Sequence, residues 1–131
     1  MWQRKNRKRK GFTLVELLVV IIILGLLAGL AAPKLINQLR GAKIDLVPPE
    51  LQTIETVIDM YLLNCGEYPN TLIDLIECPA GLENVWPGAY LDEKTLYDPW
   101  DNIYQYYPSG SDYVLFSLGE DGVESDDDIY N

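Results

Sequence analysis

The sequence has no histidine among its 131 residues and only two cysteines. Without histidine, neither a Ser-His-Asp nor a Cys-His catalytic arrangement can form, and a histidine-ligated metal site is excluded. Two cysteines alone cannot complete a four-ligand zinc site. The sequence also lacks a glycine-rich phosphate-binding loop and an HExxH motif. Together these absences argue against an enzyme.

Basic residues are scarce beyond the first ten positions. That leading segment holds six of the ten, which are Arg4, Lys5, Arg7, Lys8, Arg9 and Lys10. From Phe12 onward there are four basic residues and all twenty acidic ones, a net charge of −16. Such a body repels the phosphates of nucleic acid, so no nucleic-acid partner is expected. Basic residues placed directly before an apolar run instead fit the positive-inside rule of membrane proteins.

Charge is absent from the seventeen residues between Leu17 and Pro33. As a helix this run spans roughly 25 Å, which is just enough to cross or nearly cross a bilayer. The run is apolar on every face, so the helix needs burial on all sides, which lipid can supply. Glu16 stands at the start of the run, where a carboxylate costs at least ~2.5 kcal/mol in a membrane and usually marks function.

The residues Gly11-Phe12-Thr13-Leu14-Val15-Glu16 resemble the N-terminus of type IV pilins and type II secretion pseudopilins. The resemblance implies that a prepilin peptidase cuts after Gly11, which removes residues 1–11 as a leader, and that Phe12 is then N-methylated. It further implies that Glu16 of one subunit pairs with the terminal amine of a neighbour in a filament. The alternative is an ordinary signal peptide cut near Gly29-Leu30-Ala31, which would release a soluble secreted protein.

The expected fold is α+β, with a long N-terminal α-helix packed on a small antiparallel β-sheet. Residues 12–33 form its membrane or filament half, and residues 34–131 form a pilin-like globular domain. We expect a kink near Pro33, because proline removes a helical hydrogen bond. We also expect a break or strong kink at Pro48-Pro49, with Val47 outside the helical region, because a residue that precedes proline avoids it.

Helix and strand patterns continue beyond this pair of prolines. Apolar residues from Leu51 to Leu62 recur at helical spacing, and Gly66 is expected to end that helix. Thr71–Glu77 predicts a short helix. Two segments rich in aromatic and β-branched residues, 102–107 and 112–118, predict a β-hairpin.

Four blocks in the C-terminal part resemble the major pseudopilin of type II secretion systems. They are Tyr61–Pro69, Asp98–Tyr106 with Asp101 where a glycine is usual, Ser117–Gly122, and Asp127–Ile129. This implies a structural subunit that polymerises into a periplasmic pseudopilus and drives export of folded proteins across the outer membrane. The implied location is the bacterial inner membrane, crossed once, with the C-terminal domain in the periplasm. The implied partners are other copies, minor pseudopilins, the inner-membrane secretion platform, the prepilin peptidase and lipid. A type IV pilin of a surface filament is the alternative.

Six acidic residues crowd nine positions near the C-terminus. They are Glu120, Asp121, Glu124, Asp126, Asp127 and Asp128. One interpretation is a disordered, solvated tail, and the other is a calcium loop, because Ca²⁺ takes six to eight oxygen ligands. The resemblance to pseudopilins implies calcium. The implied ligands are the side chains of Asp121 and Asp128 and the backbone oxygens of Leu118 and Glu120, with Asp126 and Asp127 as substitutes.

The two cysteines, Cys65 and Cys78, are thirteen positions apart in the part expected outside the cytoplasm. An oxidising compartment permits a disulfide there, and the short loop that it closes would be worth roughly 3 kcal/mol. The alternative is a pair of buried thiols. The family resemblance carries no implication for these two residues.

Overall fold

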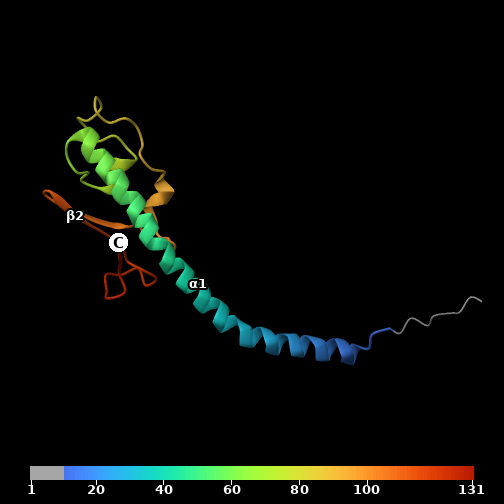
Figure 1. The fold of residues 1–131 in the computed structure, drawn as a ribbon. Coiled ribbons are helices and arrows are strands. Elements are labelled where there is room, and N and C mark those ends of the chain that lie inside the picture. The colour runs from blue at the N-terminus through green and yellow to red at the C-terminus, as the bar shows by residue number, and fades with distance from the viewer. Residues whose placement is uncertain (1–10) are drawn as a thin grey trace, which may run out of the picture. The chain divides into compact units, whose positions relative to one another are not determined.

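The computed structural model describes residues 11–131, and the basic residues 4–10 of the predicted leader lie outside this range. The chain divides into two compact units, Met1–Leu39 and Arg40–Asn131. Figure 1 shows one long helix followed by short helices and strands. In order, the elements are the α-helix α1 (Leu14–Cys65), the 3₁₀ helices η1 (Leu72–Leu75) and η2 (Glu93–Leu96), and the strands β1 (Gln105–Ser109), β2 (Asp112–Ser117) and β3 (Ile129–Tyr130). The predicted α+β fold is confirmed.

Helix α1 runs without interruption through both proline sites, so the predicted break at 47–49 is wrong (Figure 1). Val47 is helical and fully buried. Pro48 and Pro49 remove two amide donors, which leaves the carbonyls of Ile44 and Asp45 without their usual helical partners. Those residues lie on an exposed stretch where water can supply the missing bonds. Burial of apolar side chains on both sides of the prolines stabilises the continuous helix more than the lost bonds destabilise it.

The hydrophobic core of the described chain begins at Val47. Helix α1 contributes Val47, Leu51, Ile54, Val57, Ile58 and Tyr61, and the remainder of the chain contributes Leu72, Leu75, Leu96, Tyr104 and Leu115. The Tyr104 hydroxyl donates a hydrogen bond of 2.5 Å to the Glu50 carboxylate on α1. Burial raises the pKa of Tyr104, and the bond to Glu50 raises it further. A fragment that begins at Lys34 therefore contains every buried apolar side chain of the described chain.

The sheet is antiparallel, with strand order β1-β2-β3. The predicted hairpin is confirmed, but β1 starts at Gln105 because Ile103 forms an isolated bridge with Tyr97. Strand β3 was not predicted, since two residues carry no periodic signal. The predicted helix end at Gly66 is confirmed by its φ of +80° and by its amide, which donates to the Leu62 carbonyl at 2.8 Å. The predicted short helix after Thr71 is confirmed as η1.

Asp101, which stands where pseudopilins usually have glycine, is the one non-glycine residue with positive φ in the described chain, at +67°. A Cβ atom makes this conformation costly, although aspartate tolerates it better than most residues. We expect Asp101→Gly to stabilise the Lys34–Asn131 fragment by up to about 1 kcal/mol, which raises its Tm by a few °C. Asp92→Gly is the matched control, because Asp92 has an ordinary φ of −79°. Thermal melts that show an equal gain for both variants would contradict the strain at Asp101.

Candidate functional site

The predicted cleavage site lies in exposed, irregular chain. Gly11 and Phe12 precede the first turn of α1, and the Phe12 side chain is 91% exposed. Exposed chain outside regular structure is the form that a peptidase binds most readily. The structure therefore leaves the bond between Gly11 and Phe12 accessible.

Glu16 caps the helix on which it stands. One of its carboxylate oxygens accepts hydrogen bonds from the Thr13 amide at 2.8 Å and the Thr13 hydroxyl at 3.1 Å, while the Glu16 amide donates to that hydroxyl at 3.2 Å. This is a capping box, in which a residue before the helix and an acid three positions later satisfy each other's free amides. In the single chain, the carboxylate that the sequence assigns to assembly therefore has an intramolecular partner.

The N-terminal part of α1 exposes its apolar side chains. These include Leu17, Leu18, Val19, Val20, Ile21, Ile22, Ile23 and Leu24, each close to half exposed or more. The helix is long and apolar enough to cross a membrane, and its most apolar stretch has no buried residue. By itself the chain leaves this surface uncovered.

A buried carboxylate, that of Asp98, holds the start of the acidic loop, which comprises residues 118–128 between β2 and β3. Asp98 is 4% exposed, and one of its oxygens accepts hydrogen bonds from the amides of Trp100 and Asn102, both at 2.9 Å. Its other oxygen accepts a bond of 2.6 Å from the fully buried hydroxyl of Ser117, the last residue of β2. The Ser117 oxygen in turn accepts the amide of Gly119 at 3.0 Å. This chain of bonds fixes the point at which the loop leaves the sheet.

Asn102 continues this network to the loop itself. Its side-chain amide donates to the Gly119 carbonyl at 2.9 Å. Its Oδ1 atom lies only 3.0 Å from where a Cβ of Gly122 would be. Both glycines have positive φ, +69° at Gly119 and +68° at Gly122. Side chains at these two turns would be strained, so the loop depends on glycine there.

Three of the predicted metal-binding carboxylates converge on Ser125. Asp121 accepts from the Val123 amide at 3.0 Å and from the Ser125 hydroxyl at 3.2 Å. The same hydroxyl makes a short contact with Asp127, and Asp128 accepts the Ser125 amide at 3.3 Å. A serine hydroxyl carries one proton, so it can donate to only one of the two carboxylates that face its oxygen. The second carboxylate lacks a donor at this point.

This donor set fits a hard cation, which takes carboxylate and carbonyl oxygens. Within residues 11–131, however, no group of three or more His, Cys, Asp or Glu side chains is placed to hold a metal ion. Asp126 is exposed, and Glu120 turns its carboxylate to Arg40. Leu118, half-buried, follows β2 directly. The structure thus brings Asp121, Asp127 and Asp128 around Ser125, so that Asp127, predicted only as a substitute ligand, joins the two predicted side-chain ligands.

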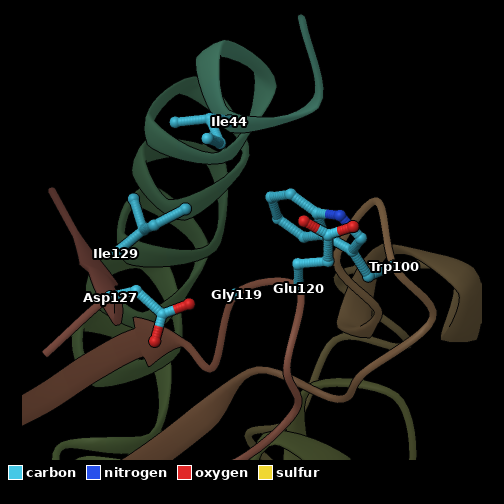
Figure 2. A pocket seen from close by; sticks show the side chains of 6 residues that line it. All are labelled: Ile44, Trp100, Gly119, Glu120, Asp127 and Ile129. Atoms are coloured by element: carbon cyan, nitrogen blue, oxygen red, sulfur yellow. The ribbon is translucent and has the colours of Figure 1, made fainter. Parts of the chain in front are cut away.

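A small pocket adjoins the loop within the Arg40–Asn131 unit. Its volume is about 160 Å³, and it is lined by Ile44, Trp100, Gly119, Glu120, Asp127 and Ile129. In Figure 2, Ile44 on α1, Ile129 and Asp127 lie on one side of the pocket, and Trp100 and Glu120 lie on the other. Two of the scarce cations lie here, because Arg40 contacts Glu120 at 2.7 Å and the Lys43 ammonium lies 5.8 Å from the Trp100 ring centre. They partly compensate the negative charge of the loop.

Both cysteines are free thiols in the structure. Cys65 is half-buried against the core at the end of α1, whereas Cys78 is exposed. The alternative of two buried thiols is therefore wrong for Cys78, because this residue follows η1 and lies on the surface.

Several contacts of the site were missed at the sequence level. Ser125 gave no signal, because serine is common in loops. Asp98, Asn102 and Ser117 receive no individual role from the sequence, which includes them only in the segments that resemble the major pseudopilin. The capping box had a readable signature, since Thr13 precedes Glu16 by three positions at a helix start.

The comparisons with known proteins bear on both parts of the chain. Residues 6–32 match the family described as "Prokaryotic N-terminal methylation motif". Residues 34–131 match the family described as "Type II secretion system (T2SS), protein G". The chain belongs to the type II secretion system protein G family.

Relatives in this family match along almost their whole length. The chain is 37% identical to the type II secretion system core protein G of Pseudomonas aeruginosa, covering 95% of this chain and 92% of the relative. It is 39% identical to that of Klebsiella pneumoniae, covering 95% of each. The crystal structure of the major pseudopilin of enterohaemorrhagic Escherichia coli is similar with a TM-score of 0.62 and 30% identity, over 74% of this chain and 88% of the other. The resemblance to pseudopilins is confirmed.

Proposed function

We propose that this chain is the major subunit of a type II secretion pseudopilus. It waits in the inner membrane with residues 34–131 in the periplasm, and then polymerises into a filament that helps to move folded proteins across the outer membrane. The observation that carries the proposal is a methylation motif ahead of an exposed apolar helix, joined to a protein G domain. Like the rest of its family, such a protein acts as a structural subunit.

The exposed apolar surface of α1 explains how one protein can be accommodated both in the membrane and in the filament. Lipid covers the apolar side chains of α1 before assembly, and the helices of other copies cover them in the filament. The protein G match across residues 34–131 favours this function over a type IV pilin of a surface filament. The methylation motif favours it over an ordinary secreted protein.

The proposed partners follow from this assembly. A prepilin peptidase removes residues 1–11, and minor pseudopilins and the inner-membrane secretion platform contact the growing filament. Self-association is heterologous, because a filament needs an interface that does not close on itself. The net charge of −16 beyond the leader leaves nucleic acid without a role.

Calcium is the proposed ion of the acidic loop. Asp121 and Asp127, which share the Ser125 hydroxyl, would hold it, with Asp128 and the backbone oxygens of Leu118 and Glu120 completing the set. When bound, the ion supplies positive charge that offsets the mutual repulsion of the carboxylates. The hydrogen bonds of Asp98 and Asn102 hold the start of the loop at Gly119 in place. The ion would therefore have to order only the outer turn of the loop, residues 121–128.

Processing provides a direct prediction. We expect the mature protein to begin at N-methyl-Phe12, and we expect Gly11→Leu to block cleavage because a bulky side chain adjoins the bond to be cut. Gly11→Ala is the matched control, and it should be cleaved at least in part because the side chain stays small. Intact mass spectrometry of protein extracted from membranes measures both. A mature species that begins near Ala32 would instead establish an ordinary signal peptide.

Filament location tests the function itself. In a strain that lacks the chromosomal copy, the wild-type chain should restore secretion of folded exoproteins, and the uncleaved Gly11→Leu chain should not. Immunogold labelling should find short filaments in the cell envelope. Long surface fibres with normal exoprotein secretion in the deletion strain would favour the type IV pilin.

A further inference from the structure

The two cysteines lie on segments that the fold holds together. Cys65 is the last residue of α1, and Cys78 follows η1 by three positions. We propose that they form an intramolecular disulfide that joins the end of α1 to the segment after η1. This inference rests on the proposed periplasmic placement of the domain, because a disulfide persists only in an oxidising compartment.

Tyr90 connects the two cysteine-bearing segments. Its backbone amide donates to the carbonyl of Leu75, the last residue of η1, at 2.8 Å. Its hydroxyl accepts a hydrogen bond of 3.0 Å from the side chain of Asn64, which directly precedes Cys65. The Tyr90 ring also lies 5.8 Å from the ring of Tyr61, one turn earlier on α1. Tyr90 thus joins the turn that ends in Cys65, through its side chain, to the helix that precedes Cys78, through its backbone amide.

A second contact holds the same region. The indole nitrogen of Trp86 donates to the Asp74 carbonyl at 3.1 Å, and its ring lies 6.2 Å from that of Tyr90. The last two residues of η1, Asp74 and Leu75, are therefore bonded to Trp86 and Tyr90, and Tyr90 contacts the last turns of α1. The segment that leads to Cys78 starts from this fixed point.

The charges around the two thiols agree with this placement. Desolvation raises the pKa of the Cys78 thiol, and the nearby Glu83 and Cys65 raise it further. Desolvation likewise raises the pKa of Tyr61, and Cys65 adds to that effect. Cys65 is therefore near enough to act electrostatically on Cys78 as well as on a residue of its own helix. Cys78 is exposed and lies outside helices and strands, so it is the partner that can move.

The bond forms by exchange with a disulfide oxidant, such as a periplasmic dithiol oxidase. The exposed Cys78 thiolate attacks one oxidant sulfur and forms a mixed disulfide, which releases the other oxidant sulfur as a thiolate. The Cys65 thiolate then attacks the Cys78 sulfur, so that the protein disulfide forms and the second oxidant sulfur leaves. Two electrons pass to the oxidant, and the two protons of the cysteine thiols end on its two sulfurs.

The consequence is a closed loop from Cys65 to Cys78 that restricts the unfolded chain. For a domain of this size, we expect reduction of the bond to lower the Tm by roughly 10 °C. The bond also keeps η1 and Tyr90 against the end of α1, where Tyr90 packs beside Tyr61.

Thiol trapping in cells tests the bond. Cells that express the full chain are quenched with acid, and the protein is alkylated with N-ethylmaleimide before and after reduction. We expect no alkylation before reduction, two alkylated cysteines after it, and a linked peptide pair by mass spectrometry. Two alkylated cysteines before reduction, in a domain that external protease digests in spheroplasts, would overturn the disulfide. Protection of the domain from that protease would instead overturn its periplasmic placement.

Thermal melts of the detergent-solubilised full chain test the effect of the bond. Wild type should lose roughly 10 °C on addition of reductant. Cys78→Ser should melt with the reduced wild type and should not respond to reductant, because Cys78 is exposed and its replacement costs little packing. Equal melts of oxidised and reduced wild type, or a reducible dimer in place of an internal bond, would overturn the proposal.

Discussion

Glu16→Gln should fold, insert into the membrane and be cleaved, yet yield at least tenfold fewer filaments than wild type. Glutamine serves at this capping position as well as glutamate, so the bonds to Thr13 and the start of α1 should survive. What is lost is the negative charge that we propose to pair with the terminal amine of a neighbouring subunit. A charge left unpaired in a dry helical core costs about 3–5 kcal/mol. This is more than the free energy that corresponds to the expected tenfold change in filament yield.

The design separates charge from shape. Glu16→Asp keeps the charge on a shorter side chain and should assemble better than Glu16→Gln. Thr13→Ala is the second control, because it removes both bonds between the Thr13 hydroxyl and Glu16 but leaves the carboxylate free to pair. Sheared filaments, quantified by sedimentation and immunoblot, are compared with membrane-extracted monomer. Wild-type filament yield from Glu16→Gln would show that the charge has no part in assembly.

Removal of calcium should lower the Tm of the Lys34–Asn131 fragment by roughly 10 °C or more. Binding to the folded form alone stabilises by about 2.7 kcal/mol at a hundredfold excess of free ion over its Kd. Without the ion, six carboxylates within nine residues repel one another, and the outer turn of the loop should open. Chelator should therefore also increase proteolysis after Leu118. Identical melts with calcium and with chelator would identify the acidic run as a solvated loop.

Neighbouring carboxylates provide matched variants for this experiment. Asp121→Asn and Asp127→Asn should each melt like chelated wild type and should gain nothing from added calcium, because both side chains face the Ser125 hydroxyl. Asp126→Asn should behave like wild type, since Asp126 stands next to Asp127 on the same loop but is not among the three carboxylates that contact Ser125. An effect of Asp126→Asn as large as that of Asp127→Asn would assign the ligands differently.

The hydrogen bonds at the start of the acidic loop have a different role from that of its carboxylates. Asn102 holds the Gly119 carbonyl, and Asp98 holds Asn102 and Ser117. These residues lie outside the acidic run, and their hydrogen bonds position the start of the loop. Their role depends on contacts between parts of the chain that are as far apart as residues 98 and 117.

The sequence by itself determined the methylation motif, the long apolar helix and the family. Each depends on a contiguous pattern, in which basic residues, Gly11-Phe12, Glu16 and an uncharged run follow one another. The hairpin and the end of α1 at Gly66 were also predictable, because turn residues and alternating side chains act locally. The composition likewise indicated an acidic loop, although it did not show which carboxylates meet.

Only the tertiary structure decided the course of α1 through Pro48-Pro49. Local rules predict a break there, but Val47, Leu51 and Ile54 are fully buried on the same helix, and their burial outweighs two missing hydrogen bonds. The same holds for the acidic loop, where Arg40, eighty positions earlier than Glu120, contacts the Glu120 carboxylate, and Asn102 donates to the carbonyl of Gly119. Contacts between distant residues depend on how the whole domain packs, and no local pattern in the sequence encodes them.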